Sequence, residues 1–374
     1  MRPLRIVVSG MVAGDPDQGG ATWAVLQYVL GLRRLGHEVL LVEPIDQLTL
    51  PIAASFAVTT ARYGLQGAAA LVARDSQATW GLERDALRAR TRRADVLINA
   101  SGMLRDPELT APIPTRVYLD LDPGFTQLWA DVDGIDMGFD GHTHFVTVGG
   151  LIGRLTCAVP TCGRDWIPTL PPVVLDYWPF AAHASTGVFT TVANWRAYGS
   201  IEHDGRHFGQ KAHSLRRLAG IPKRSSRPFA LALSIHAQER TDLQTLKENR
   251  WRLVDPVAAA GTAAGYHRFV QGSFAEIGIA KSGYVESRCG WFSDRSAAYL
   301  ASGRPVLAQD TGFAGKLPVG EGLLSFRDED GAVAAAEAVS SRYPSHRLAA
   351  RRIAEEFFDS DRVLSGLLEA VGAR

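Results

Sequence analysis

The stretch from 290 to 312 reads GWFSDRSAAYLASGRPVLAQDTG and predicts a helix followed by a buried strand. Ser293 suits the N-cap position, because its hydroxyl can accept a hydrogen bond from a backbone amide of the first turn. Asp294 stands in that turn, where the helix dipole favours a carboxylate. Gly303 and Pro305 then end the helix and lead into an apolar run. The order of helix, tight connection and strand is typical of α/β sheets.

The start of this helix predicts a binding site for an anion. Arg295 and Ser296 lie beside backbone amides that have no partner within the helix. In open α/β sheets such helix starts face the edge where ligands bind. We therefore assign Ser293, Asp294, Arg295 and Ser296 to a site suited to a diphosphate. The alternative is a simply capped helix in which Asp294 and Arg295 pair in solvent.

Strands and helices alternate on both sides of this stretch, as expected for two doubly wound sheets of parallel strands. In the second half we predict strands at 188–194, 229–235, 252–254, 276–280, 305–308 and 323–326, with helices at 210–219, 240–251, near Tyr266, 295–302 and 331–341. In the first half we predict strands at 4–9, 39–42, 95–99, 117–121 and 145–148, with helices at 21–35 and 80–93. The fold class predicted is α/β, with two Rossmann-like domains facing a cleft.

A proline-rich segment between the two halves predicts the domain boundary. Pro168, Pro171 and Pro172 lie there between two tryptophans, a composition that resists regular structure. We expect an N-terminal domain at 1–179 and a C-terminal domain at 180–350. The remaining stretch, 351–374, is amphipathic and is expected to form a helix that packs back on the first domain.

Composition excludes several classes of protein. The chain has 374 residues, 46% of them hydrophobic and 21% charged, so it is a folded globular protein. Its net charge of +1 offers no field to attract nucleic acid or an anionic membrane, and we expect neither partner. The three cysteines lack disulfide or zinc spacing, and we see neither a signal peptide nor a membrane span, which together predict a cytoplasmic location.

The loop 11–20 follows the first predicted strand and precedes a helix. Gly19 and Gly20 could let backbone amides approach a phosphate or an acceptor sugar there. The loop lacks both the dinucleotide fingerprint and the P-loop spacing, which disfavours a nicotinamide dehydrogenase or an ATPase. The alternative for the two glycines is a tight turn between strand and helix.

A resemblance follows from these residues. The segment 299–306, YLASGRPV, with Asp310-Thr311-Gly312 after the next strand, resembles the donor-binding half of GT-B glycosyltransferases. This resemblance implies that the second domain binds a nucleotide diphosphate sugar and the first domain an acceptor. It also implies that Arg196 and Lys211 neutralise the diphosphate, and that Lys281, Ser282 and Gly283 contribute to donor binding. Solvated surface cations are the alternative for Arg196 and Lys211.

The sequence departs from the family pattern at one position. Five residues before Gly303, where retaining members carry a donor-binding glutamate, this chain has Ala298. Asp294 stands one helical turn earlier, on the same face of the helix. The motif therefore does not predict whether the anomeric configuration is retained.

Acidic residues at the end of a first-domain strand are candidates for a catalytic base. Asp120 lies near the end of the predicted strand at 117–121, Asp122 follows it directly, and His144 lies beyond it. An inverting transfer needs a side chain that takes the acceptor proton. The alternatives are turn chemistry before Pro123 for the acids and a structural role for the histidine.

We expect neither a metal nor another cofactor. His203, His207 and His213 match no compact ligand pattern, and cationic side chains can stabilise a diphosphate without a metal. The function predicted is transfer of a hexosyl group to a small molecule or a glycan. A composition rich in Ala, Arg and Gly favours a bacterial enzyme of natural-product glycosylation. The alternatives are a nucleotide-sugar 2-epimerase and a non-catalytic sugar-binding or nucleotide-binding protein. The donor base, the acceptor and the oligomeric state stay open.

Overall fold

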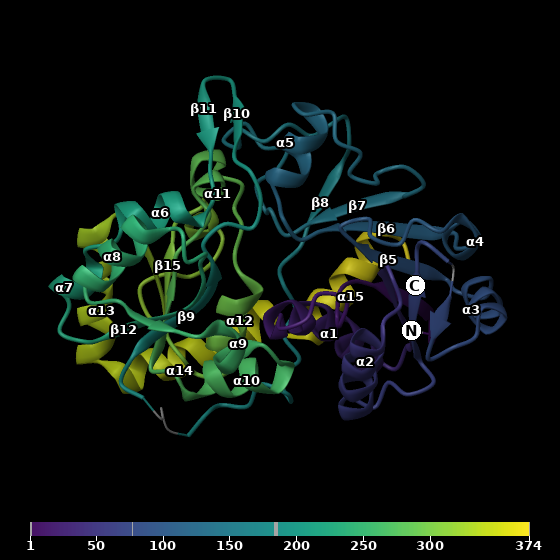
Figure 1. Ribbon diagram of the computed structural model, residues 1–374, viewed down its shortest axis with the longest axis horizontal. Coiled ribbons are helices and arrows are strands. Elements are labelled where there is room, and N and C mark those ends of the chain that lie inside the picture. Colours follow the sequence, from purple (N-terminus) through teal and green to yellow (C-terminus); the bar gives the residue numbers. More distant parts are fainter. Residues whose placement is uncertain (1, 77, 183–185, 374) are drawn as a thin grey trace.

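The computed structural model describes residues 2–76, 78–182 and 186–373, which form two α/β domains lying side by side (Figure 1). This arrangement confirms the predicted fold class. The first domain is built on an eight-stranded sheet in the order β4-β3-β2-β1-β5-β6-β7-β8. Its strands are β1 (Arg5–Ser9), β2 (Glu38–Ile45), β3 (Ala69–Ala73), β4 (Thr79–Trp80), β5 (Val96–Ala100), β6 (Thr115–Asp120), β7 (His144–Thr147) and β8 (Trp166–Pro168).

The second domain is built on a six-stranded parallel sheet in the order β13-β12-β9-β14-β15-β16. Its strands are β9 (Phe189–Asn194), β12 (Phe229–Ser234), β13 (Arg252–Val254), β14 (Ala275–Gly278), β15 (Val306–Gln309) and β16 (Leu323–Phe326), and β10 (Ile201–His203) with β11 (Arg206–Phe208) forms a separate hairpin.

Helices cover both faces of the first sheet, which explains why central strands such as β1 and β5 are apolar along most of their length. On β1, Ile6 and Val8 pack with Leu26 on one face, while Val7 packs with Leu87 on the other. The helices of the chain are α1 (Gly19–Arg34), α2 (Leu50–Arg62), α3 (Arg84–Thr91), α4 (Pro107–Thr110), α5 (Phe125–Asp131), α6 (Lys211–Arg217), α7 (Ile221–Arg224), α8 (Arg240–Glu248), α9 (Pro256–Ala260), α10 (Ala263–Gly272), α11 (Ser282–Ser287), α12 (Asp294–Ala301), η1 (Phe313–Gly315), α13 (Glu329–Ser341), α14 (Tyr343–Ile353), η2 (Ala354–Phe358) and α15 (Ser360–Ala370).

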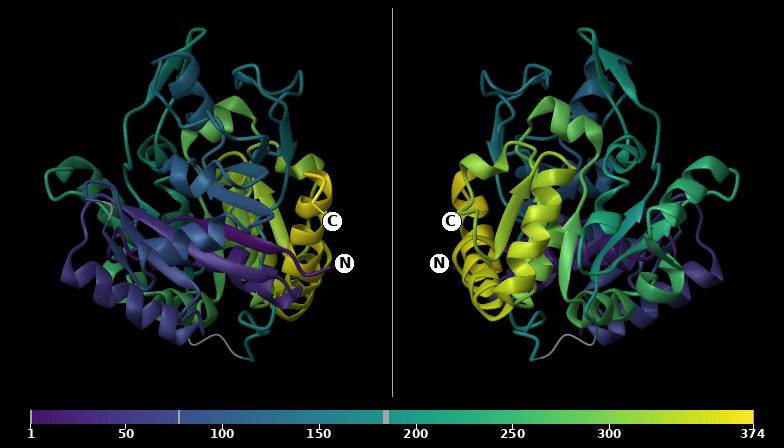
Figure 2. Two further views of the ribbon diagram at one scale, coloured as in Figure 1. Left: turned by 90° about the vertical axis from the view of Figure 1, so that its right-hand side faces the viewer. Right: turned by 90° about the vertical axis from the view of Figure 1, so that its left-hand side faces the viewer.

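The C-terminal helices connect the two domains. α14 packs against α12 of the second domain, and α15 packs against α1 of the first. Gly31 of α1 permits this contact, because a Cβ there would lie 2.5 Å from Leu364 Cδ1. The two chain ends consequently lie on the same side of the molecule (Figure 2). In the part of the chain that the structure describes, no helix is long and apolar enough to cross a membrane.

Several elements differ from the sequence-based expectation. The helix expected at 80–93 begins only at Arg84, because Thr79–Trp80 forms an antiparallel edge strand. The proline-rich segment contributes the short strand β8, whose position at the sheet edge tolerates Pro168. α2, β3 and the hairpin β10–β11 were not predicted. Three-residue strands such as those of the hairpin are too short to give a clear alternation of polar and apolar residues.

Candidate functional site

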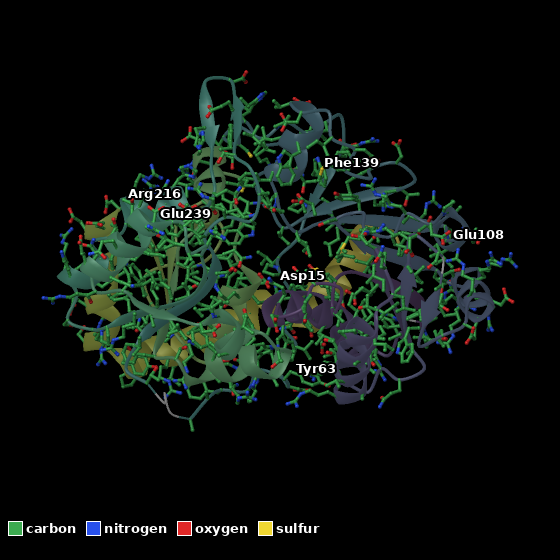
Figure 3. The ribbon with its side chains drawn as sticks, in the orientation of Figure 1. Asp15, Tyr63, Glu108, Phe139, Arg216 and Glu239 are labelled. Atoms are coloured by element: carbon green, nitrogen blue, oxygen red, sulfur yellow. The ribbon has the colours of Figure 1, made fainter. Side chains whose placement is uncertain are left out.

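A cavity of about 450 Å³ lies between the two domains at the carboxyl ends of both sheets. This volume is within the range of about 300 to 1,000 Å³ common for small-molecule sites. Figure 1 shows α1, α9, α10 and α12 gathered where the domains meet, and Figure 3 shows Asp15, shortly before α1, at the same junction. Five connections after strands contribute to the cavity wall, through Gly19 after β1, Leu121 after β6, Lys211 after β9, Pro256 after β13 and Lys281 after β14.

Lys211 is the first residue of α6 and is buried at the cavity wall. Its Nζ donates a hydrogen bond to the carbonyl oxygen of Ile279. Burial, together with the charges of Arg295 and Lys281, holds the pKa of Lys211 well below its usual range. An anion in the cavity would offset both the burial and the repulsion, so this ammonium group is suited to an anionic ligand.

Arg295, in the first turn of α12, lines the same cavity. Its Nε donates to Glu276 Oε1 at 2.6 Å, and its Nη1 donates to the carbonyl oxygen of Val192 at 3.0 Å. Burial by itself would lower the pKa of Arg295, but the Glu276 carboxylate raises it above the usual range. Glu276 is fully buried, and its Oε2 has no hydrogen-bond partner among the described residues. The pair therefore fixes the guanidinium group and keeps it charged.

Lys281 lines the cavity and also joins the two domains. Its Nζ donates to both carboxylate oxygens of Asp122, at 3.0 and 2.9 Å. The hydroxyls of Tyr198 and Tyr284 donate to the same carboxylate. Burial lowers the pKa of Lys281, and Asp122 partly offsets that effect. Asp122 comes from the first domain and its three donors come from the second, so the cluster is an interdomain contact.

The start of α12 faces the cavity, as the sequence predicted. Ser293 caps the helix by accepting a hydrogen bond from the Arg295 amide at 3.2 Å. Asp294 lines the cavity, and burial raises the pKa of its carboxyl group. Ser296 is buried and is not among the residues that line this cavity.

Gly19 and Gly20 line the cavity, but packing between the domains is what requires them to be glycines. A Cβ on Gly19 would lie 2.3 Å from the Thr262 carbonyl oxygen, and a Cβ on Gly20 would lie 3.1 Å from the Tyr266 ring. The preceding loop is held by Glu43, whose carboxylate accepts hydrogen bonds from three successive backbone amides: Val12, Ala13 and Gly14.

Besides Ser296, three further residues assigned to the donor lie away from the cavity wall. Arg196 is exposed and donates to Glu239 at 2.7 Å, and Figure 3 shows Glu239 beside Arg216 on the second domain. Ser282 and Gly283 begin α11, and the Gly283 amide is already bound to the Gly209 carbonyl at 2.9 Å. The resemblance assigned them by their order in the chain. The structure instead exposes Arg196 at the surface and packs the start of α11 against Gly209.

Two candidate bases are not among the residues that line the cavity. Asp120 is fully buried, and its carboxylate accepts hydrogen bonds from Thr126, Gln127 and Thr147. These contacts hold the turn after β6 and leave the carboxylate without contact with solvent. His144 begins β7 and pairs with Val117, whereas Asp120 pairs with Thr147 at the other end of the strand. His144 therefore lies toward the amino edge of the sheet, away from the cavity.

Sequence reasoning missed the partners of the site residues. Tyr198 lies on the long connection between β9 and α6, and Tyr284 lies in α11. Neither stands in a recognisable motif. Glu276 offered a signal, because it is the one charged residue within the otherwise apolar strand Ala275–Gly278, and such a residue must be paired when the strand is buried.

Solved structures that resemble this chain along almost its whole length include sugar-transferring enzymes. An alpha-glucosyltransferase in complex with UDP-glucose and DNA containing an abasic site is 12% identical, with 99% of this chain and 100% of that chain covered and a TM-score of 0.63. HepE from Anabaena, in complex with UDP and glucose, is 9% identical, with 99% and 100% covered and a TM-score of 0.60. The chain has the GT-B fold. Sucrose-phosphate synthase from Thermosynechococcus elongatus, with 11% identity, coverage of 99% of both chains and a TM-score of 0.54, shares this GT-B architecture. No protein-family profile and no curated protein matches the sequence.

The comparisons correct one expectation about partners. From the net charge of +1 we expected no nucleic acid. The alpha-glucosyltransferase structures that share the GT-B fold hold DNA together with UDP or UDP-glucose. This finding overturns the exclusion, because a net charge sums over the whole chain, whereas an acceptor contacts only one face of the molecule.

Proposed function

We propose that this protein is a glycosyltransferase that moves a hexosyl group from a nucleoside diphosphate sugar to an acceptor hydroxyl. One observation carries the proposal: Lys211, Lys281 and Arg295 converge on a single cavity between the two domains of a GT-B fold. Lys281 pairs with Asp122 and Arg295 with Glu276, whereas Lys211 forms an ion pair with none of the described carboxylates. A diphosphate has the charge and size that complete this arrangement.

The reaction follows from these charges. The acceptor oxygen attacks the anomeric carbon and its proton passes to a base, while the bond between that carbon and the diphosphate oxygen breaks. The leaving diphosphate takes the bonding electrons, and cationic side chains already in place stabilise it as its charge grows. We propose that Lys211, Lys281 and Arg295 do this without a metal ion. Ser293 and Asp294 border the same cavity and are proposed to contact the donor.

Asp122 is proposed as the acceptor's base. It comes from the first domain, and its partners Lys281 and Tyr284 both line the cavity. The acceptor is proposed to be a natural product or a glycan, and DNA belongs in the test because of the structures that share the fold. We further propose a cytoplasmic location, since Cys157, Cys162 and Cys289 are all free thiols.

A thermal-shift screen against UDP, dTDP, GDP and ADP tests the donor half of the proposal. A nucleoside diphosphate at about 100 times its dissociation constant should add about 2.7 kcal/mol to the free energy of unfolding. Turnover is then measured with the matching nucleotide sugar and three acceptor sets: small phenols, oligosaccharides, and DNA with hydroxymethylated bases. No stabilisation by any of the four would contradict the proposal, and fast conversion of donor alone into an epimer would indicate an epimerase instead.

A further inference from the structure

The carboxylate of Asp122, on the first domain, accepts hydrogen bonds from three side chains of the second domain. Both of its oxygens bind Lys281 Nζ, Tyr284 donates to Oδ1, and Tyr198 donates to Oδ2. Its side chain is only 27% exposed and that of Lys281 only 18%. The carboxylate is thus enclosed by groups of the other domain, as a bound anion would be.

Lys281 is the member of this cluster that also borders the donor cavity. Its ammonium group lies 4.2 Å from the ring centroid of Tyr198 and 5.0 Å from that of Phe125. Aromatic faces hold a cation without fixing its direction, and a lysine stem is flexible. Lys281 can therefore exchange one anionic partner for another while these rings stay in place.

We infer that Lys281 binds Asp122 while the cavity is empty. When the donor enters the cavity, Lys281 leaves Asp122 and binds the diphosphate instead. The inference rests on the proposed function and adds its regulation. Two anions compete for one cation, and a diphosphate carries more charge than a carboxylate. After the exchange, Tyr198 and Tyr284 still donate to Asp122, so the carboxylate is not left without partners.

The exchange of partners by Lys281 couples donor binding to the availability of Asp122 as a base. While the cavity is empty, Lys281 Nζ donates to both oxygens of Asp122 and so occupies the carboxylate. Once Lys281 has moved, both oxygens of Asp122 have lost this donor, and the carboxylate is free to accept the acceptor's proton. Donor binding then precedes activation of the base, which disfavours proton transfer when no sugar is present.

The test measures UDP binding by calorimetry to the full chain. Asp122→Asn removes the competing charge and should tighten UDP binding about tenfold, a typical coupling between linked equilibria. Lys281→Met should weaken it by a similar factor. In the Lys281→Met background, Asp122→Asn should give no gain, because the cation for which the two anions compete is gone.

Equal or weaker UDP binding by Asp122→Asn would overturn the inference, as would an equal gain in both backgrounds, which would indicate a general field effect. If Asp122→Asn does not fold, Tyr284→Phe decides. This variant removes one donor from Asp122, strengthens its hold on Lys281 and should weaken UDP binding about two- to threefold, whereas unchanged or tighter binding would refute the exchange. Failure of the unsubstituted protein to bind any of the four nucleoside diphosphates would instead reject the proposed function itself.

Discussion

Replacing Lys211 by methionine should weaken the binding of a nucleoside diphosphate and at the same time raise thermal stability. The ammonium group is buried at the cavity wall, and its pKa lies well below the usual range because burial and two neighbouring cations oppose its charge. In the protein without ligand, the charge of Lys211 lowers the free energy of unfolding. With a diphosphate in the cavity it becomes a charge-assisted contact.

The magnitudes follow from the surroundings of Lys211. Loss of one charge-assisted hydrogen bond costs about 1.5 to 3 kcal/mol, so the dissociation constant should rise about 10- to 150-fold. In the free protein, methionine fills a similar volume and removes a buried charge, whose desolvation destabilises the fold by several kcal/mol. It also leaves the Ile279 carbonyl without its donor, at a cost of about 1 to 3 kcal/mol. The net gain of about 1 kcal/mol should raise Tm by about 2 to 4 °C.

Calorimetric titration and thermal unfolding without ligand measure the two effects. Arg196→Met is the matched control, because it removes the same charge from a surface pair with Glu239 outside the cavity. The dissociation constant of Arg196→Met for the nucleoside diphosphate should stay within about twofold of the parent value. The reasoning is refuted if Lys211→Met binds as tightly as the parent, or if the control loses as much affinity.

Three further predictions concern the metal, the domain contact and pH. Turnover should survive EDTA, since the cavity cations replace a divalent ion, and a loss that magnesium or manganese restores would contradict this. Gly19→Ala should lower Tm by several degrees and weaken donor binding, because the new Cβ would lie 2.3 Å from the Thr262 carbonyl oxygen. Such overpacking costs about 1 to 3 kcal/mol. Gly366→Ala is the control and should have neither effect, because a Cβ there has nothing within 4 Å. Burial raises the pKa of Asp120 from 3.8 to about 6, so the folded protein holds this proton more tightly than the unfolded chain does. The stability contributed by Asp120 is therefore full below about pH 4 and falls by about 3 kcal/mol as pH rises through 6. Urea unfolding of wild type and Asp120→Asn at both ends of that range should show this change, and a difference independent of pH would contradict it.

Local sequence predicted most of the framework. Apolar runs marked the buried strands β1 and β12, and the N-cap Ser293 marked the start of α12. These signals depend on periodicity and capping within about one element, so neighbouring residues are sufficient to specify them. The helix start assigned Arg295 to the donor and the family resemblance assigned Lys211 and Lys281, and all three line one cavity in the structure.

Tertiary structure alone decided what the individual polar side chains do. Asp120 and Asp122 are two residues apart, yet one is sealed under three hydrogen bonds while the other reaches across to the second domain. The partner of Asp122 is Lys281, 159 residues later in the chain. Gly19 is likewise explained by the Thr262 carbonyl oxygen of the other domain rather than by its own loop. Burial, pKa and competition for a cation depend on contacts between segments distant in sequence, and these contacts form only when the two sheets dock.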